Sequence, residues 1–213
     1  MRRTNILVAD DHPMICMGLR RMLEPEFQVI ACVGDGRALV QTVTKLQPDL
    51  VLLDVGMPLL NGLDAARELK KLVPRVKLIF LTVNSDPTIA VEALRVGASG
   101  YLLKESEGEE IIRGIREVLR GNSYVSPQIK AAMEERFIRN PNAMDKPRQL
   151  SDRQREVLQL LAEGRLMKEV ADVLHISRHT VRFHKRRIME ELEIQNNSEL
   201  VQYAIKHAMI SPR

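Results

Sequence analysis

Long apolar segments are missing from this sequence of 213 residues. No stretch approaches the ~18 consecutive apolar residues that a membrane-spanning helix needs. The first residues, 1–5, also lack the apolar core of a secretory signal peptide. We therefore expect a protein without a membrane segment that stays in the cytoplasm.

Cysteine is scarce, and a strong net charge is absent. The two cysteines, Cys16 and Cys32, are too few and too poorly placed for a disulfide framework, so we expect free thiols. The formal net charge of +4 is too mild to name a polyanion as a partner. The positions of the basic residues must decide that question. Internal repeats and low-complexity segments are absent as well, and the length fits two domains of ~100–200 residues each.

The first half of the chain alternates regularly between short apolar runs and helix-length segments. The apolar runs predict strands at 6–10, 28–33, 50–53, 76–81 and 100–103. The segments between them predict helices at 13–23, 36–46, 62–73, 86–96 and 107–120. Runs that are almost entirely apolar indicate parallel strands buried on both faces. Right-handed crossovers then give an α/β doubly wound five-stranded parallel sheet of strand order 2-1-3-4-5.

The second half changes character. Residues 122–149 contain one amphipathic stretch, Gln128 to Ile138, which predicts a helix followed by a flexible tether. From Leu150 onward the pattern is helical only, with helices predicted at 152–163, 166–174, 178–192 and 198–208. We therefore divide the chain into a first domain, a linker and an all-α four-helix domain, at 1–121, 122–149 and 150–213.

Four of the predicted strands end in polar residues that can take part in chemistry. The first strand runs into Asp10 and Asp11, the third into Asp54, the fourth into Thr82 and the fifth into Lys104. In a parallel sheet of this kind the ligand site lies outside the carboxyl ends of the strands. A polar residue at a single strand end usually just meets solvent. Four converging strand ends favour a functional site.

The residue types at these strand ends predict phosphoryl chemistry. Three crowded carboxylates need a cation, and hard oxygen ligands favour Mg²⁺. Asp54 can act as a nucleophile toward a phosphoryl group and form an aspartyl phosphate. Lys104 and Thr82 are suited to contact the phosphate oxygens. His12 lies beside the aspartates, but Mg²⁺ prefers oxygen ligands, so we expect this histidine to pack over the site instead.

Residues 4–121 carry a set of motifs at these positions: Asp10-Asp11, Leu53-Asp54-Val55-Gly56-Met57-Pro58, Gly62, Thr82, Tyr101 and Lys104. This set resembles the receiver domain of two-component response regulators. The resemblance implies a flavodoxin-like fold and phosphorylation of Asp54 by a sensor histidine kinase.

The same resemblance implies a role for each residue of the site. It implies that Asp11, Asp54 and the Gly56 carbonyl hold Mg²⁺ directly, while Asp10 acts mainly through water. Thr82 is implied as the switch hydroxyl and Tyr101 as the switch aromatic residue.

The 178–187 segment holds five Lys or Arg side chains and no acidic one. An isolated basic helical face is usually just solvated. Here a short helix at 166–174 and a three-residue turn at 175–177 come directly before the basic helix. Two helices joined in this way are typical of a motif that inserts its second helix into the major groove of DNA.

Residues 150–210 carry further motifs: Leu150-Ser151, Arg153, Glu156-Val157-Leu158, Gly164, Lys168-Glu169-Val170-Ala171, Ile176-Ser177, Thr180-Val181, His184, Leu192 and Ser198-Glu199-Leu200-Val201. They resemble the LuxR-type helix-turn-helix of the NarL/FixJ response regulators. The resemblance implies that base edges are contacted by Arg182, Phe183 and Arg186. It implies that DNA phosphates are contacted by Lys168, Thr180, His184 and Lys185.

Two residues depart from this pattern. His175 and Glu193 stand where the family often has glycine, and each costs ~1 kcal/mol if the backbone stays left-handed there. The resemblance also implies that the receiver covers the recognition helix at rest.

We therefore predict a DNA-binding transcriptional regulator, not an enzyme, that is switched by Mg²⁺-dependent phosphorylation of Asp54. The expected partners are double-stranded DNA, a sensor histidine kinase, RNA polymerase and a second copy of the chain in a homodimer. One alternative is a regulator that works without phosphorylation, through protein or ligand contacts. A second alternative, a hydrolase with an aspartyl-phosphate intermediate, typically has another acid where this chain has Gly56.

Overall fold

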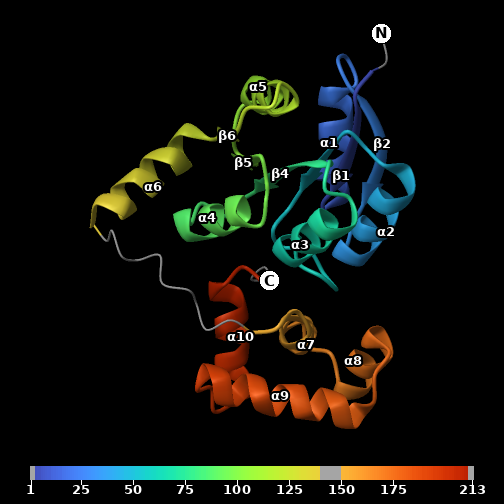
Figure 1. Ribbon diagram of the computed structural model, residues 1–213, viewed down its shortest axis with the longest axis vertical. Coiled ribbons are helices and arrows are strands. Elements are labelled where there is room, and N and C mark those ends of the chain that lie inside the picture. Colours follow the sequence, from blue (N-terminus) through green and yellow to red (C-terminus); the bar gives the residue numbers. More distant parts are fainter. Residues whose placement is uncertain (1–2, 140–149, 211–213) are drawn as a thin grey trace.

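The computed structural model describes residues 3–139 and 150–210, and Figure 1 shows their arrangement. The predicted tether after residue 139 lies outside the described residues. The strands are β1 (Asn5–Ala9), β2 (Gln28–Val33), β3 (Leu50–Leu53), β4 (Lys77–Thr82), β5 (Gly100–Leu103) and β6 (Tyr124–Val125). The helices between and after them are α1 (Pro13–Leu23), α2 (Gly36–Leu46), α3 (Gly62–Leu72), α4 (Pro87–Arg95), α5 (Gly108–Leu119) and α6 (Pro127–Arg139). The helices of the second half are α7 (Asp152–Ala162), α8 (Met167–Leu174), α9 (Arg178–Leu192) and α10 (Asn197–Lys206).

The strands form one parallel sheet of order β2-β1-β3-β4-β5-β6. The doubly wound fold and its 2-1-3-4-5 order are confirmed, but the predicted number of five strands is wrong by one. The additional strand, β6, falls in the segment predicted as linker and pairs with Gly100 and Tyr101 of β5. Two residues are too short to give an apolar pattern of their own, so this strand depends on the neighbouring edge of the sheet.

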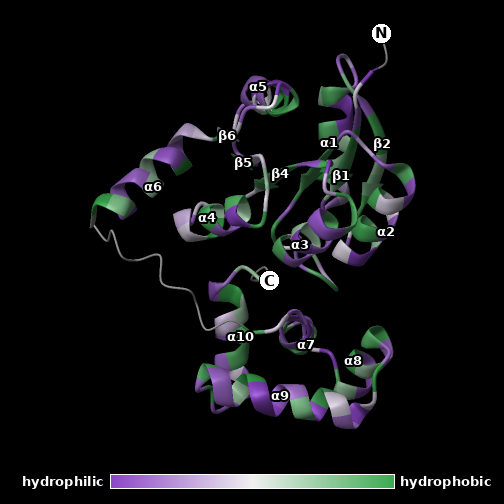
Figure 2. Ribbon diagram, in the orientation of Figure 1, coloured by the Kyte–Doolittle hydropathy of each residue, from purple (hydrophilic) through white to green (hydrophobic). Residues whose placement is uncertain are grey.

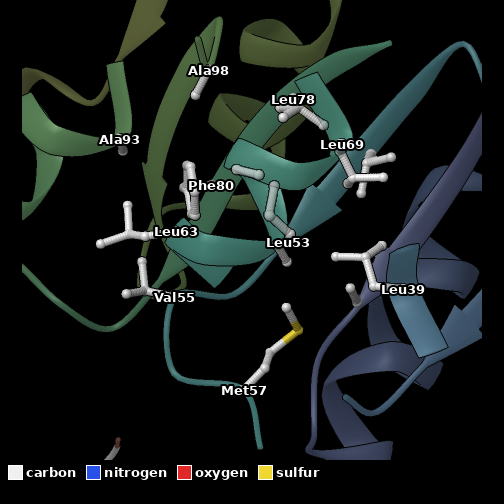
Figure 3. Packing of buried hydrophobic residues seen from close by; sticks show 14 of the residues in the cluster. Leu39, Leu53, Val55, Met57, Leu63, Leu69, Leu78, Phe80, Ala93 and Ala98 are labelled. Atoms are coloured by element: carbon white, nitrogen blue, oxygen red, sulfur yellow. The ribbon is translucent and has the colours of Figure 1, made fainter. Parts of the chain in front are cut away.

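Both faces of the sheet are buried, and this explains why the strands are apolar throughout. Along β1, Leu7 and Ala9 pack into one hydrophobic cluster, while Ile6 and Val8 pack into the other. Helices α2, α3 and α4 cover the first face, and α1 and α5 cover the second (Figure 1). Figure 3 shows part of the first cluster, where Leu53 and Phe80 from adjacent strands meet side chains of the covering helices.

The helices of the second half form a separate small core. Val170, Val181 and Ile188 are buried in it. A capping box starts α7, in which the Ser151 side chain accepts from the Gln154 amide and the Gln154 side chain accepts from the Ser151 amide. Figure 2 shows hydrophilic residues over much of α7 and α9, the helices whose outer faces lie outside this core. Among the described helices, none is both long and apolar enough to cross a membrane.

The backbone at both positions without the usual glycine is left-handed. His175 ends α8 with φ 52°, and Glu193 ends α9 with φ 57°. Both residues thus adopt the conformation that glycine favours, with the steric cost of contact between Cβ and the carbonyl group.

We predict that His175→Gly raises the free energy of unfolding by about 1 kcal/mol, because glycine removes the steric cost of the left-handed conformation. Urea unfolding of the 150–213 region, followed by circular dichroism, measures this change. The control is Asp172→Gly inside α8, where glycine lowers helix stability. A loss of stability in His175→Gly would contradict this explanation.

Candidate functional site

The sheet brings its predicted polar strand ends together at one edge. The Asp54 amide donates to the Ala9 carbonyl over 2.9 Å, which ties the end of β3 to the end of β1. The Lys104 amide donates to the Thr82 carbonyl over 2.9 Å, which ties the end of β5 to that of β4. Asp10, Asp54 and Thr82 are buried there, whereas Asp11 is exposed.

Lys104 lies between the two buried carboxylates. Its Nζ is 2.6 Å from Asp10 Oδ2 and 2.6 Å from Asp54 Oδ2. Burial lowers the pKa of Lys104, but the Asp54 charge and the hydrogen bonds to Asp10 and Asp54 outweigh burial and raise this pKa above its usual value. The ammonium therefore stays charged and compensates two carboxylates that have left water.

Asp10, Asp11 and His12 form the other half of the site. Their ligand atoms lie within 4.8 Å of one another, the one such group of three found in the described part of the chain. His12 Nδ1 is 2.8 Å from Asp11 Oδ1 and 3.2 Å from Asp10 Oδ1, so the histidine pairs with the aspartates from a largely exposed position. Carboxylate oxygens dominate this set, and their chemistry fits Mg²⁺.

Glycine at position 62 is required by the backbone at the end of β3. A Cβ at Gly62 would lie 2.0 Å from the Asp54 carbonyl oxygen. The amino-terminal end of α3 therefore rests directly on Asp54. Asn61 caps this helix by accepting from the Asp64 amide over 3.0 Å.

Thr82 and Tyr101 meet at Asn84. The Thr82 hydroxyl accepts from the Asn84 amide over 3.2 Å, and the Tyr101 hydroxyl donates to the Asn84 carbonyl over 2.7 Å. The Tyr101 ring is fully buried, 6.2 Å from the ring of Phe80. Burial, together with the charges of Asp54 and Asp86, raises the pKa of the Tyr101 phenol. The Tyr101 side chain thus lies inside the receiver, tied to the backbone at Asn84.

The predicted recognition helix begins as expected. Ser177 accepts from the Thr180 amide over 3.0 Å and caps α9. The predicted contact residues lie on exposed or half-buried positions of α8 and α9, namely Lys168, Thr180, Arg182, Phe183, His184, Lys185 and Arg186.

Some of these side chains already have partners. Lys185 Nζ donates to the Asn197 side chain over 2.8 Å, and Arg186 Nε donates to Glu190 over 2.8 Å. Phe183 is 52 % exposed, and Arg187 lies over its ring at 5.6 Å. An exposed phenylalanine beside cationic side chains can make apolar contact with thymine methyl groups.

The expectation that the receiver covers the recognition helix is wrong for this structure. Figure 1 shows α9 on the far side of its domain, while α7 faces α3 of the receiver. Polar contacts across the boundary come from α7, and Ala208, after α10, packs into the first hydrophobic cluster of the receiver. Arg155 Nε is 2.6 Å from Asp64 Oδ1, and Arg37 Nη2 is 2.8 Å from Glu156 Oε2.

Sequence reasoning missed the residue at the centre of this boundary. Gln159 is fully buried, and its side chain accepts from the Asn61 amide over 2.8 Å. Its amide nitrogen donates to the Met57 carbonyl over 2.9 Å. Glu163 accepts from the Leu59 amide over 3.0 Å on the next turn of α7. Polar residues on a helix are typical of a solvated face, so the sequence carried no signal for this contact.

Comparison with known proteins decides the family. Residues 6–116 match the response regulator receiver domain, and residues 148–204 match the LuxR family of bacterial regulatory proteins. The chain belongs to the response regulators. It is a DNA-binding transcriptional regulator of the two-component type, with a receiver domain and a LuxR-type helix-turn-helix.

Similar proteins cover almost the full length of this response regulator. The transcriptional regulatory protein DegU of Brevibacillus brevis is 32 % identical over 99 % of this chain and 97 % of its own. The oxygen regulatory protein NreC of Staphylococcus carnosus is 34 % identical over 96 % and 98 %. RcsB from Salmonella enterica serovar Typhimurium, solved bound to a promoter in the presence of the phosphomimetic BeF3−, is 28 % identical over 95 % and 98 %, with a TM-score of 0.63.

We predict that Lys104→Met lowers the free energy of unfolding of the metal-free regulator by about 3 kcal/mol. Removing the ammonium leaves Asp10 and Asp54 buried without their counter-charge. Urea unfolding in EDTA measures the loss. The control is Lys71→Met, which removes an exposed pair with Asp152 and should cost at most about 1 kcal/mol. Equal effects of the two variants would refute the assigned role of Lys104.

Proposed function

We propose that this regulator is switched by Mg²⁺-dependent phosphorylation of Asp54, with a sensor histidine kinase as donor. The observation that carries the proposal is the position of Asp54, buried at the convergence of the strand ends and 2.6 Å from the Lys104 ammonium. One oxygen of Asp54 forms the bond to phosphorus as the bond to the donor breaks. The chain itself turns over no substrate, and it acts in the cytoplasm, where the DNA is.

Each neighbouring residue has a task in this proposal. Asp11, Asp54 and the Gly56 carbonyl would hold Mg²⁺ directly, and Asp10 would hold it through water. When bound, Mg²⁺ would supply positive charge to offset the charge that builds up on the phosphoryl oxygens. Lys104 turns from Asp54 toward the phosphate, where its ammonium acts as a point charge.

Thr82 and Tyr101 respond to the new group. The Thr82 hydroxyl donates to a phosphate oxygen and so loses its present place beside the Asn84 amide. Because Tyr101 binds the Asn84 carbonyl, this change reaches the start of α4 through the 84–86 turn.

The proposed DNA contacts follow from the exposed face of α9. Arg182, Phe183 and Arg186 contact base edges, while phosphates are contacted by Lys168, Thr180, His184 and Lys185. One recognition helix makes few contacts, so two copies bind paired half-sites as a homodimer and engage RNA polymerase there. RcsB, which is similar to this chain, has been solved bound to a promoter, and this supports the proposal.

Phosphorylation acts, in this proposal, by releasing α7 from the receiver. Because α9 is already exposed, release does not uncover the recognition helix. Release instead frees the DNA-binding domain to take the orientation that paired half-sites require. To lower the fraction of molecules with α7 docked from 99 % to 1 %, phosphorylation must stabilise the released state relative to the docked state by about 5 kcal/mol.

One observation favours a second candidate, a regulator controlled without phosphorylation. Tyr101 is fully buried, and its hydroxyl donates to the Asn84 carbonyl. If the switch aromatic residue is already buried in the receiver, phosphorylation would change its position less. Protein or ligand contacts would then control the domains.

We predict that acetyl phosphate with Mg²⁺ adds one phosphoryl group to the regulator, because the metal and Lys104 offset the charge of the transferring group. Intact-mass measurement detects the addition. Asp54→Asn and EDTA should each abolish it, and Asp49→Asn, at the opposite end of the sheet, is the control. Full labelling of Asp54→Asn would remove the first candidate and leave the second.

For the DNA interface we predict two distinct losses. Lys185→Ala should weaken binding about equally on all sequences and reduce the salt dependence by about one counterion, because this residue serves a phosphate. Arg182→Ala should relax preference at particular base pairs by ~1–3 kcal/mol. Salt titration and binding to a randomised DNA pool measure the two effects. Unchanged base preference in Arg182→Ala would contradict its assigned role.

A further inference from the structure

The loop between β3 and α3 binds α7 through its own backbone. This loop, residues 55–61, offers the Met57 carbonyl to Gln159, the Leu59 amide to Glu163 and the Asn61 amide again to Gln159. The three bonds measure 2.9, 3.0 and 2.8 Å. Gln159 also donates to Glu163 over 2.9 Å, so the two side chains act as one polar surface on α7.

The same loop begins at the phosphoacceptor. The Val55 amide donates to Asp54 Oδ1 over 2.6 Å, and Gly56 supplies the carbonyl assigned above to the metal. At the other end of the loop, Asn61 caps α3, and Gly62 rests on the Asp54 carbonyl. Gly56 and Gly62 are therefore the sequence neighbours of Met57 and Asn61, the two residues whose backbone groups Gln159 binds.

A side-chain path connects the same surface to α4. Asp64 Oδ1 binds Arg155 of α7 over 2.6 Å and also binds Arg67 over 2.5 Å. Arg67 in turn binds Glu92 of α4. Helix α7 thus contacts the part of the receiver that follows Asp54 and, through two further residues, the helix that follows Thr82.

We infer that Gln159 is a positioning residue for the phosphoacceptor site, although it lies in the other domain. Its carboxamide fixes the conformation of the 55–61 loop and hence the place of the Gly56 carbonyl. Docking of α7 and loading of Asp54 with Mg²⁺ and phosphate are then thermodynamically linked, and each changes the other by the same factor.

The direction of this linkage rests on the proposed function. If phosphorylation releases α7, the docked α7 opposes metal and phosphate binding to the same degree. Replacing Gln159 with an apolar residue leaves the Met57 carbonyl and the Asn61 amide buried without partners. When α7 leaves the receiver, water can bind the Met57 carbonyl and the Asn61 amide. The variant therefore shifts toward the state in which α7 is released.

The test compares the full chain with Gln159→Met and with Gln202→Met, a matched control on an exposed position of α10. In Gln159→Met, the Mg²⁺ concentration for half-maximal labelling by acetyl phosphate should fall roughly five- to tenfold, within the usual range of coupling between sites. Hydrogen exchange at the Leu59 and Asn61 amides should quicken before any metal is added. Gln202→Met should match the wild type in both measurements.

A second variant tests whether the change in Mg²⁺ requirement comes only from a general loss of structure. Gln159→Glu retains an acceptor for the Asn61 amide but cannot donate to the Met57 carbonyl. It should also lower the Mg²⁺ requirement while remaining folded. Small-angle scattering of the wild type, before and after acetyl phosphate, measures the release of α7 independently.

The outcomes separate this inference from the proposed function. In one outcome, hydrogen exchange at Leu59 and Asn61 is faster in both variants, but the Mg²⁺ concentration for half-maximal labelling is unchanged or higher. This result overturns the inference and leaves the proposed function standing. Unchanged exchange at Leu59 and Asn61 also overturns it, because Gln159 would then not hold the loop. A wild type that is labelled on Asp54 without any expansion overturns the proposed release of α7, and the inference falls with it.

Discussion

Lys104 stands between Asp10 and Asp54, and the rest of the receiver is arranged around these three buried charges. Two buried carboxylates require a cation within contact distance. Because the strand ends converge, the Lys104 ammonium lies 2.6 Å from an oxygen of each carboxylate. A phosphoryl group on Asp54 would add negative charge to this small volume. The ammonium and a metal ion must then redistribute, so whatever rests on Asp54 experiences the change.

Two segments adjoin this site. One is the 55–61 loop with the start of α3, because Gly62 touches the Asp54 backbone. The other is the 82–86 segment, where Thr82 and Tyr101 meet at Asn84. Both segments lead to helices that reach the DNA-binding domain: α3 directly through Asp64, and α4 through Glu92 and its partner on α3. In the proposed function, a charge change at Asp54 thus has two routes of contacts to the domain boundary.

The sheet could be predicted because its signals are local. Strands such as β3 are apolar at every position since both of their faces are covered, and this pattern differs from that of any solvent-facing helix. The convergence of Asp10, Asp54, Thr82 and Lys104 followed from topology alone. Strand β6 escaped prediction because its two residues have no pattern apart from the edge of β5.

The domain boundary could not be predicted, and the reason is physical. Gln159 and Arg155 are polar residues on a helix whose sequence is typical of a solvated surface, and only the tertiary fold buries Gln159 completely. A buried carboxamide is stabilised by its partners, here the backbone of the 55–61 loop, whose polar groups no side-chain pattern reveals. The orientation of α9 depends on this same contact, so it was equally inaccessible from the sequence.

The use of α7 for docking leaves the DNA-binding domain with two independent faces. One face carries Gln159 and binds the receiver, while the other carries α9 and stays open to solvent. A docked monomer can therefore still reach a single half-site. Paired half-sites are more demanding, since two recognition helices must lie about 34 Å apart with a two-fold relation. A receiver that holds α7 fixes the orientation of α9 with respect to any receiver dimer, so the docked form restricts which pairs of half-sites can be bound. In the proposed function, control of DNA binding then rests on the freedom of the domain to turn, and that freedom is limited by the hydrogen bonds and ion pairs between α7 and the receiver.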